Sequence, residues 1–198
     1  MSPLAAALGG EHFKIAQSLY ERGANVDVQG PYSRTPLYGA SCSGHLEIVE
    51  WLLSHGANPN VREEVGVCLF PLHWAAHFGY VEVSRLLLQY KADDNAQDSN
   101  GKTPLHNAST NGRFDVALLL LEHDADVNAR DKSHKTPLHR ALEGRGVSEG
   151  WLLEVARLLV EHGANIDAED NKGRTAFQVA SKGGYHDVAK FLSDQDSK

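Results

Sequence analysis

The chain has 198 residues, of which 41% are apolar and 23% are charged, so it carries enough apolar material for a folded core. Its 26 acidic and 19 basic residues give a net charge of -7, which disfavours a nucleic-acid binder because phosphate binding needs a clustered basic surface. The two cysteines are too few for a disulfide framework. No apolar run could span a bilayer, and no secretory signal opens the chain. We therefore expect an intracellular protein, cytoplasmic or nuclear, without membrane contact.

A short motif recurs along the chain at nearly constant spacing. Its four clear copies are Thr35-Pro36-Leu37-Tyr38, Phe70-Pro71-Leu72-His73, Thr103-Pro104-Leu105-His106 and Thr136-Pro137-Leu138-His139, and Thr175-Ala176-Phe177-Gln178 is a degenerate fifth. The prolines are separated by 35, 33 and 33 residues. Threonine suits a helix N-cap and proline the first helical turn, so each copy predicts a helix start. A second landmark, Gly-Ala-Asn-x-Asn/Asp or a variant of it, follows each copy and predicts a left-handed helix end.

These motifs resemble the ankyrin repeat, whose period is about 33 residues and whose hallmark is Thr-Pro-Leu-His. The resemblance implies an all-α repeat solenoid in which helix pairs are joined by β-hairpin fingers around a concave surface. We expect a single ankyrin-repeat domain over residues 1–198, with repeats at 3–29 (partial), 30–64, 65–97, 98–130, 131–169 and 170–193 (partial). Because the first copy starts abruptly and lacks a finger, we also expect a fragment of a longer protein.

Two single residues and two insertions depart from the repeat pattern. Lys91 and Asp124 stand where other copies have a helix-ending glycine, so local backbone strain is expected there. Two extra residues enter the third finger within 63–70, and six extra residues separate the helices of the fifth copy within 143–151. We expect Trp151 to begin the second helix of that copy and to tuck against its neighbours.

The sequence contains no catalytic or metal-binding motif, so we expect neither an enzyme nor a cofactor. His73, His106 and His139 fall at the repeat start, where the family uses the ring for hydrogen bonds between neighbouring loops. Cys42 and His45 have a Cys-x-x-His spacing, but a zinc site needs about four ligands and no second pair is near.

Comparison between copies separates scaffold from binding surface. Positions that stay the same serve the fold, and positions that vary are free to specify a partner. The variable finger and inner-helix positions predicted to bind a partner are Tyr32, Arg34, Val67, Leu69, Trp74, His77, Phe78, Lys102, Asn107, Asn111, Lys135 and Arg140. Local burial of Val67 and Leu69 by the longer finger is the alternative for those two, and the basic finger residues could instead attract phosphates or an acidic protein segment.

The function predicted from the sequence is protein–protein interaction as an adaptor or scaffold, through the concave finger-and-palm surface, by a monomeric chain. A structural spacer within a larger multidomain protein is the alternative.

Overall fold

The computed structural model describes residues 3–10, 12–64, 66–67, 69–144 and 148–195. These residues form helices and turns, without a β-strand. The helices are α1 (Pro3–Gly9), α2 (Phe13–Glu21), α3 (Pro36–Ser43), α4 (Leu46–Ser54), α5 (Pro71–Phe78), α6 (Val81–Gln89), α7 (Pro104–Thr110), α8 (Phe114–Glu122), α9 (Pro137–Ala141), α10 (Glu149–Glu161), α11 (Ala176–Gly183) and α12 (His186–Gln195), with a short 3₁₀ turn, η1 (Pro31–Ser33).

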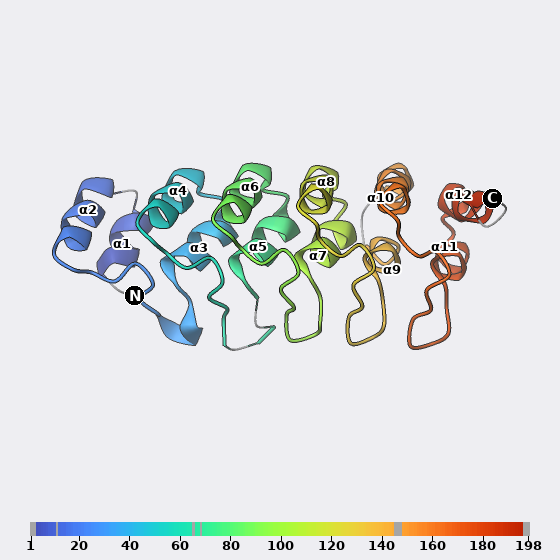
Figure 1. The fold of residues 1–198 in the computed structure, drawn as a ribbon, viewed down its shortest axis with the longest axis horizontal. Helices are drawn as coiled ribbons and strands as arrows, with labels where there is room; N and C mark the ends of the chain where they lie inside the picture. The colour runs from blue at the N-terminus through green and yellow to red at the C-terminus, as the bar shows by residue number, and fades with distance from the viewer. Residues whose placement is uncertain (1–2, 11, 65, 68, 145–147, 196–198) are drawn as a thin grey trace. The chain divides into compact units, whose positions relative to one another are not determined.

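The chain falls into two compact units, residues 1–75 with 80–93 and residues 76–79 with 94–198. In the first unit α1 packs on α2 and α3, α3 packs on α4, and α4 packs on α6. In the second unit α7 packs on α8 and α9, α10 on α8, α9 and α12, and α11 on α9 and α12 (Figure 1). We call the first helix of each pair the inner helix and the second the outer helix.

The repeated Thr-Pro-Leu motif begins the inner helices, as predicted. Thr35, Thr136 and Thr175 each accept a hydrogen bond from the backbone N–H three residues later, which caps the helix. The leucine of the motif is the centre of each copy's core, because Leu37, Leu72, Leu105 and Leu138 are at most 1% exposed. The repeated residues are therefore scaffold, as expected from their constancy between copies.

The outer helices end in left-handed residues. Gly23, Gly56 and Gly163 have φ of +86° to +87° at this position. Lys91 and Asp124, which replace glycine there, keep the same backbone with φ of +68° and +67°. The strain predicted from the sequence is present, since a side chain in this region costs about 1–2 kcal/mol.

The fingers are the loops that precede the inner helices, and each takes the number of its repeat copy: the second to sixth fingers lie at residues 30–34, 63–69, 98–102, 131–135 and 170–174. In each, the N–H of the first residue donates to the carbonyl of the last, as from Asp131 to Lys135 at 3.0 Å. In the last three fingers the carboxylate of the first residue also accepts two backbone N–H groups, as Asp98 does from Asn100 and Lys102. The hairpin is thus a tight turn without a strand ladder in the described residues.

The insertion in the fifth copy lies between α9 and α10, and its residues 145–147 are outside the described part of the chain. Its last residues extend α10, which starts at Glu149 and is longer than the other outer helices. Trp151 lies in this helix as predicted, but its side chain is 51% exposed, so the expectation that it tucks against the neighbouring helices was wrong. The Glu149 carboxylate instead accepts the Asp187 N–H at 2.8 Å, at the start of α12.

Candidate functional site

The second finger carries a cluster of aromatic and charged side chains. The Arg34 guanidinium donates through Nε to the Glu63 carboxylate at 2.7 Å, and the Tyr38 hydroxyl donates to the same carboxylate at 2.8 Å. Arg34 lies 5.5 Å from the Tyr32 ring centre and 5.4 Å from that of Tyr38, within the range of cation–π attraction. Burial, and then the bond to Glu63, raise the pKa of Tyr38 to about 12. The cluster therefore holds Arg34 in one orientation.

Around this cluster lie the other predicted residues of the first unit. Tyr32 is 57% exposed and has φ of +66°, a strained conformation for a tyrosine. Trp74, on α5, stands edge-on to Tyr38 with ring centres 6.2 Å apart. Val67 is exposed, whereas Leu69 is partly buried and its carbonyl accepts the Glu63 N–H. Of the two alternatives for the longer finger, burial thus holds only in part, and only for Leu69.

In the second unit, His77 and Phe78 end α5 near polar residues of α7. Phe78 is 39% exposed and its ring meets that of His77 edge-on at 4.8 Å. The Asn111 amide lies 3.1 Å from His77 Nδ1 and also donates to the carbonyl of Asn107. Burial, and then the charges of Arg113 and Lys102, lower the pKa of His77. A neutral His77 beside an exposed phenylalanine makes this an apolar surface with polar neighbours.

A network of ion pairs joins the fifth and sixth fingers. Lys135 Nζ lies 2.5 Å from the Glu143 carboxylate, and Arg140 bonds both Glu143 at 3.1 Å and Asp131, through Nε, at 2.6 Å. Arg174 Nη2 lies 2.6 Å from the Asp170 carboxylate. The side chains of Lys135 and Arg140 are only 13% and 17% exposed. Both predicted binding residues are therefore engaged within the chain.

The two finger aspartates of this network stay ionised despite their burial. Burial alone would raise the pKa of Asp131, but the Arg140 side chain and the backbone donors of Lys135 and Ser133 bring it below its ordinary value. Asp170 has its pKa lowered in the same way, by the Arg174 side chain and backbone N–H groups. Each carboxylate thus fixes both its finger turn and an arginine.

Two of the repeat-start histidines, His106 and His139, link neighbouring loops, as the family resemblance implied. The Thr103 N–H donates to His106 Nδ1 at 3.1 Å, so the proton is on Nε2, which donates to the Lys135 carbonyl at 3.0 Å. His139 bridges Thr136 and the Arg174 carbonyl in the same manner. Burial lowers the pKa of both rings, which keeps them neutral. Within the described residues no group of three or more His, Cys, Asp or Glu side chains could hold a metal ion.

Three features of the site were missed by the sequence analysis. Glu63 and Glu143 hold Arg34, Lys135 and Arg140 in place, yet neither was singled out. Glu63 could have been found, because it stands at the finger position that Asp98 and Asp131 occupy in later copies. The third feature is a hollow beside the second finger, at Gly39, which depends on side-chain packing and had no sequence signal beyond variation at that position.

Comparison with known proteins bears directly on the repeat. A family model described as "Ankyrin repeats (3 copies)" matches residues 1–63, 66–131 and 128–198, which together cover nearly the whole chain. The chain belongs to the ankyrin-repeat family. Ankyrin repeats are protein-interaction modules.

Curated relatives share part of this ankyrin array. Protein phosphatase 1 regulatory subunit 27 of Mus musculus is 32% identical over 95 residues, which are 48% of this chain and 60% of the relative. E3 ubiquitin-protein ligase Ufd4 of Drosophila melanogaster is 32% identical over 90 residues, 46% of this chain and 3% of the relative. The putative E3 ubiquitin-protein ligase XBAT35 of Arabidopsis thaliana is 37% identical over 86 residues, which are 42% of this chain and 18% of the relative. The matches span less than two thirds of each relative.

Among the described helices of this ankyrin array, none has the length and apolar character needed to cross a membrane.

Proposed function

We propose that the chain is a non-catalytic adaptor or scaffold that holds a partner protein through its fingers and inner-helix surface. The observation that carries this proposal is the contrast between repeated and variable positions. The repeated leucines are buried, whereas the variable positions present Tyr32, Val67 and Phe78 to solvent. Aromatic residues are enriched among the few side chains that dominate binding energy at protein interfaces. Exposed aromatic groups on a rigid frame therefore favour a binding role over a spacer.

Relatives are consistent with a role in larger assemblies, since one is named a regulatory subunit and two are named ubiquitin ligases. The partial coverage of those proteins means that the ankyrin array alone is shared. The partner of this chain is accordingly proposed only as another protein.

The test compares exposed apolar residues on the fingers and inner helices with one on an outer helix. Immobilised full-length chain would capture proteins from cell extract, with Tyr32→Ala, Phe78→Ala and Ile15→Ala as variants. Ile15 is exposed on α2 and serves as the matched control. We expect Tyr32→Ala and Phe78→Ala each to weaken capture of at least one protein by about 1–3 kcal/mol, with Ile15→Ala unchanged.

Circular dichroism of each variant would verify that the helices are intact. Capture that is the same for all three variants would contradict the proposal and favour the spacer.

A further inference from the structure

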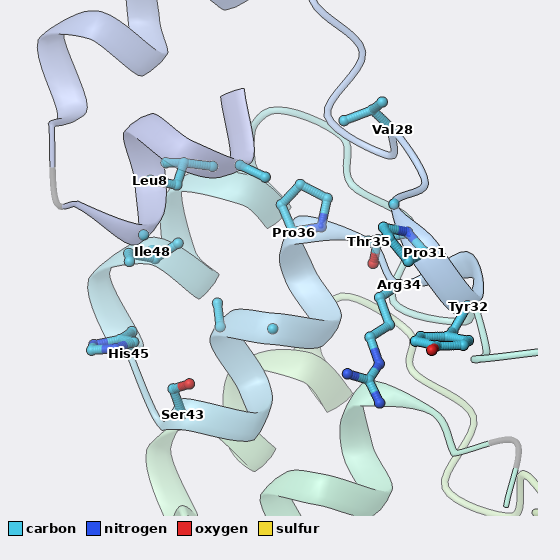
Figure 2. Close-up of a pocket in the computed structure, with 15 residues that line it drawn as sticks. Leu8, Val28, Pro31, Tyr32, Arg34, Thr35, Pro36, Ser43, His45 and Ile48 are labelled. Atoms are coloured by element: carbon cyan, nitrogen blue, oxygen red, sulfur yellow. The ribbon is translucent and has the colours of Figure 1, made fainter. Parts of the chain in front are cut away.

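A hollow with a volume of about 590 Å³ lies beside the second finger, entirely within the first unit. Its walls come from α1, from the segment leading into the finger, from α3 and from the start of α4, and they include Leu8, Val28, Pro36 and Ile48 (Figure 2). The volume lies within the range of about 300–1,000 Å³ found for ligand pockets. The hollow is therefore large enough for a bulky side chain with part of its own backbone.

The hollow is open because Gly39 has no side chain. Gly39 lies in α3 at the position occupied by Trp74, Asn107 and Arg140 in later copies. A Cβ built at Gly39 would meet nothing within 4 Å, and the residue is helical rather than left-handed. Glycine within a helix destabilises it by about 0.5–1 kcal/mol relative to alanine. Backbone geometry thus gives no reason for glycine here, whereas an empty space for a ligand does.

The electrostatics of the hollow single out one kind of ligand. Among the residues that the structure describes, no acidic side chain lines it, although the chain has 26 acidic residues and a net charge of -7. Arg34 and His45 are its basic residues, and Figure 2 shows them at opposite ends. Arg34 directs Nε and Nη2 at the Glu63 carboxylate, which pairs with its charge, while its Nη1 has no hydrogen bond within the described residues. An anion at the rim would therefore accept from Arg34 Nη1 without displacing the bonds to Glu63.

The wall next to Arg34 is the ring of Tyr32. This ring is exposed, and the residue is held in a left-handed conformation by the finger, whose Tyr32 carbonyl accepts the Glu64 N–H at 3.2 Å. Strained residues of this kind cluster at ligand-binding sites, where the surrounding structure maintains them. The tyrosine face offers apolar contact beside a guanidinium, which suits an apolar group that is followed by a carboxylate.

We propose that this pocket binds a segment of a partner protein in which a bulky apolar side chain stands next to an Asp or Glu. The apolar side chain fills the space over Gly39, and the carboxylate accepts from Arg34 or His45. This inference rests on the proposed function, because it names the ligand chemistry of one part of the binding surface.

The test starts from a phage-displayed library of random twelve-residue peptides selected on the full-length chain. We expect enrichment of peptides with Leu, Ile, Met, Phe or Trp beside Asp or Glu. The strongest peptide would then be synthesised, and its affinity measured by fluorescence polarisation against wild type, Gly39→Leu and Gly150→Leu. Gly150 is the matched control, since it also lies in a helix with nothing within 4 Å of a built Cβ.

Filling the pocket with Gly39→Leu should weaken peptide binding about tenfold or more, and Gly150→Leu should leave it unchanged. A thermal melt would show that Gly39→Leu is folded, with a midpoint at or above that of wild type because leucine is the better helix former. Replacing the acidic residue of the peptide by its amide tests the charge without altering the protein, and should weaken binding by about threefold or more.

Equal binding to wild type and Gly39→Leu, or enrichment of peptides without an acidic residue, would overturn the pocket proposal. If that happens while Phe78→Ala still reduces protein capture, the proposed function stands and only the pocket is lost. If no variant changes the binding of either the peptide or the captured proteins, both proposals fail.

Discussion

The same three repeat positions hold opposite chemistry in the two units. In the second copy they are Arg34, Gly39 and Cys42, and the space over Gly39 is open. In the fifth copy they are Lys135, Arg140 and Glu143, whose side chains join one ion-pair network. The backbone frame is equivalent, since both inner helices begin with a capping threonine and a proline. The side chains at these positions therefore decide whether a copy offers a pocket or a closed polar surface.

This difference has an energetic meaning for binding. A partner that used Arg140 would have to replace its bonds to Asp131 and Glu143, so little net free energy would be gained. A partner that entered the hollow at Gly39 would displace solvent from the space over the glycine, and a carboxylate on it could accept from Arg34 Nη1 while the Arg34–Glu63 pair stays in place. The fifth copy is thus better suited to stability and the second to recognition.

The largest expected effect comes from breaking the network with Arg140→Ala. The Asp131 side chain is fully buried and would lose Arg140, with which it forms an ion pair in the described part of the chain. Removing one member of a buried pair costs about 3–5 kcal/mol, so we expect a loss near the lower end, because backbone N–H groups still bond Asp131. Urea denaturation followed by circular dichroism measures the loss.

Arg85→Ala is the control for that experiment. Arg85 pairs with Glu82 at 3.5 Å on the exposed face of α6, and such surface pairs contribute about 0–1 kcal/mol. Equal losses for Arg140→Ala and Arg85→Ala would mean that the network adds no more to stability than a surface pair.

Alanine substitutions at one glycine of each copy should change the stability of the chain in opposite directions. A Cβ at Gly144, directly after the network residue Glu143, would lie 2.3 Å from the Thr110 carbonyl oxygen, so the backbone would have to move. We expect Gly144→Ala to destabilise the chain by about 1–3 kcal/mol, as overpacking does. Gly39→Ala should instead stabilise it by about 0.5–1 kcal/mol, because its space is open and the site is helical. Thermal melts that shift both variants in the same direction would contradict this contrast.

Much of the frame could be predicted from the sequence. The Thr-Pro-Leu copies gave the inner helix starts, and the equivalence of Lys91 and Asp124 with glycines gave their left-handed backbone, because these are local properties of the chain. The exposure of Trp151 and the hollow at Gly39 depend on how distant segments pack, which the repeat pattern does not encode. The pairing of Lys135 with Glu143 has the same character, since it depends on the insertion that alters the end of α9.

A smaller effect concerns how the stability of the folded chain depends on pH. It arises at the residue three positions after the capping threonine. That residue is His106 or His139 in the second unit and Tyr38 in the first. The pKa of His106 is lowered from 6.5 by burial, so the unfolded chain takes up its proton at a higher pH than the folded chain. The stability from this histidine is therefore complete above pH 6.5 and is lost as the pH falls from there through the folded pKa.

Gln178 shows how to remove that dependence. It occupies the same position in the last copy, where its side-chain oxygen accepts the Thr175 N–H at 3.1 Å and it does not titrate. We expect His106→Gln to lose less free energy of unfolding than wild type as the pH falls from about 7 to about 5, because glutamine takes up no proton. Urea midpoints at several pH values measure this difference, and parallel curves for the two proteins would refute it.

The smallest expected effect tests the outer-helix ends, where each unit has one non-glycine residue in a left-handed conformation. Lys91 in the first unit and Asp124 in the second have almost the same φ. Glycine relieves about 1–2 kcal/mol of steric strain there, but part of this gain is offset because glycine makes the unfolded chain more flexible. We expect Lys91→Gly to stabilise the chain by about 0.5–1 kcal/mol, and Asp124→Gly by less, because aspartate tolerates this conformation better than lysine.

The substitution leaves one neighbouring hydrogen bond intact. The Asn60 side-chain amide donates to the backbone carbonyl of Lys91, which glycine also has. Gly56→Ala, at the same position with φ of +86°, should have the opposite effect. Thermal midpoints decide the matter: if Lys91→Gly lowers the midpoint, the lysine side chain contributes more than its backbone strain removes.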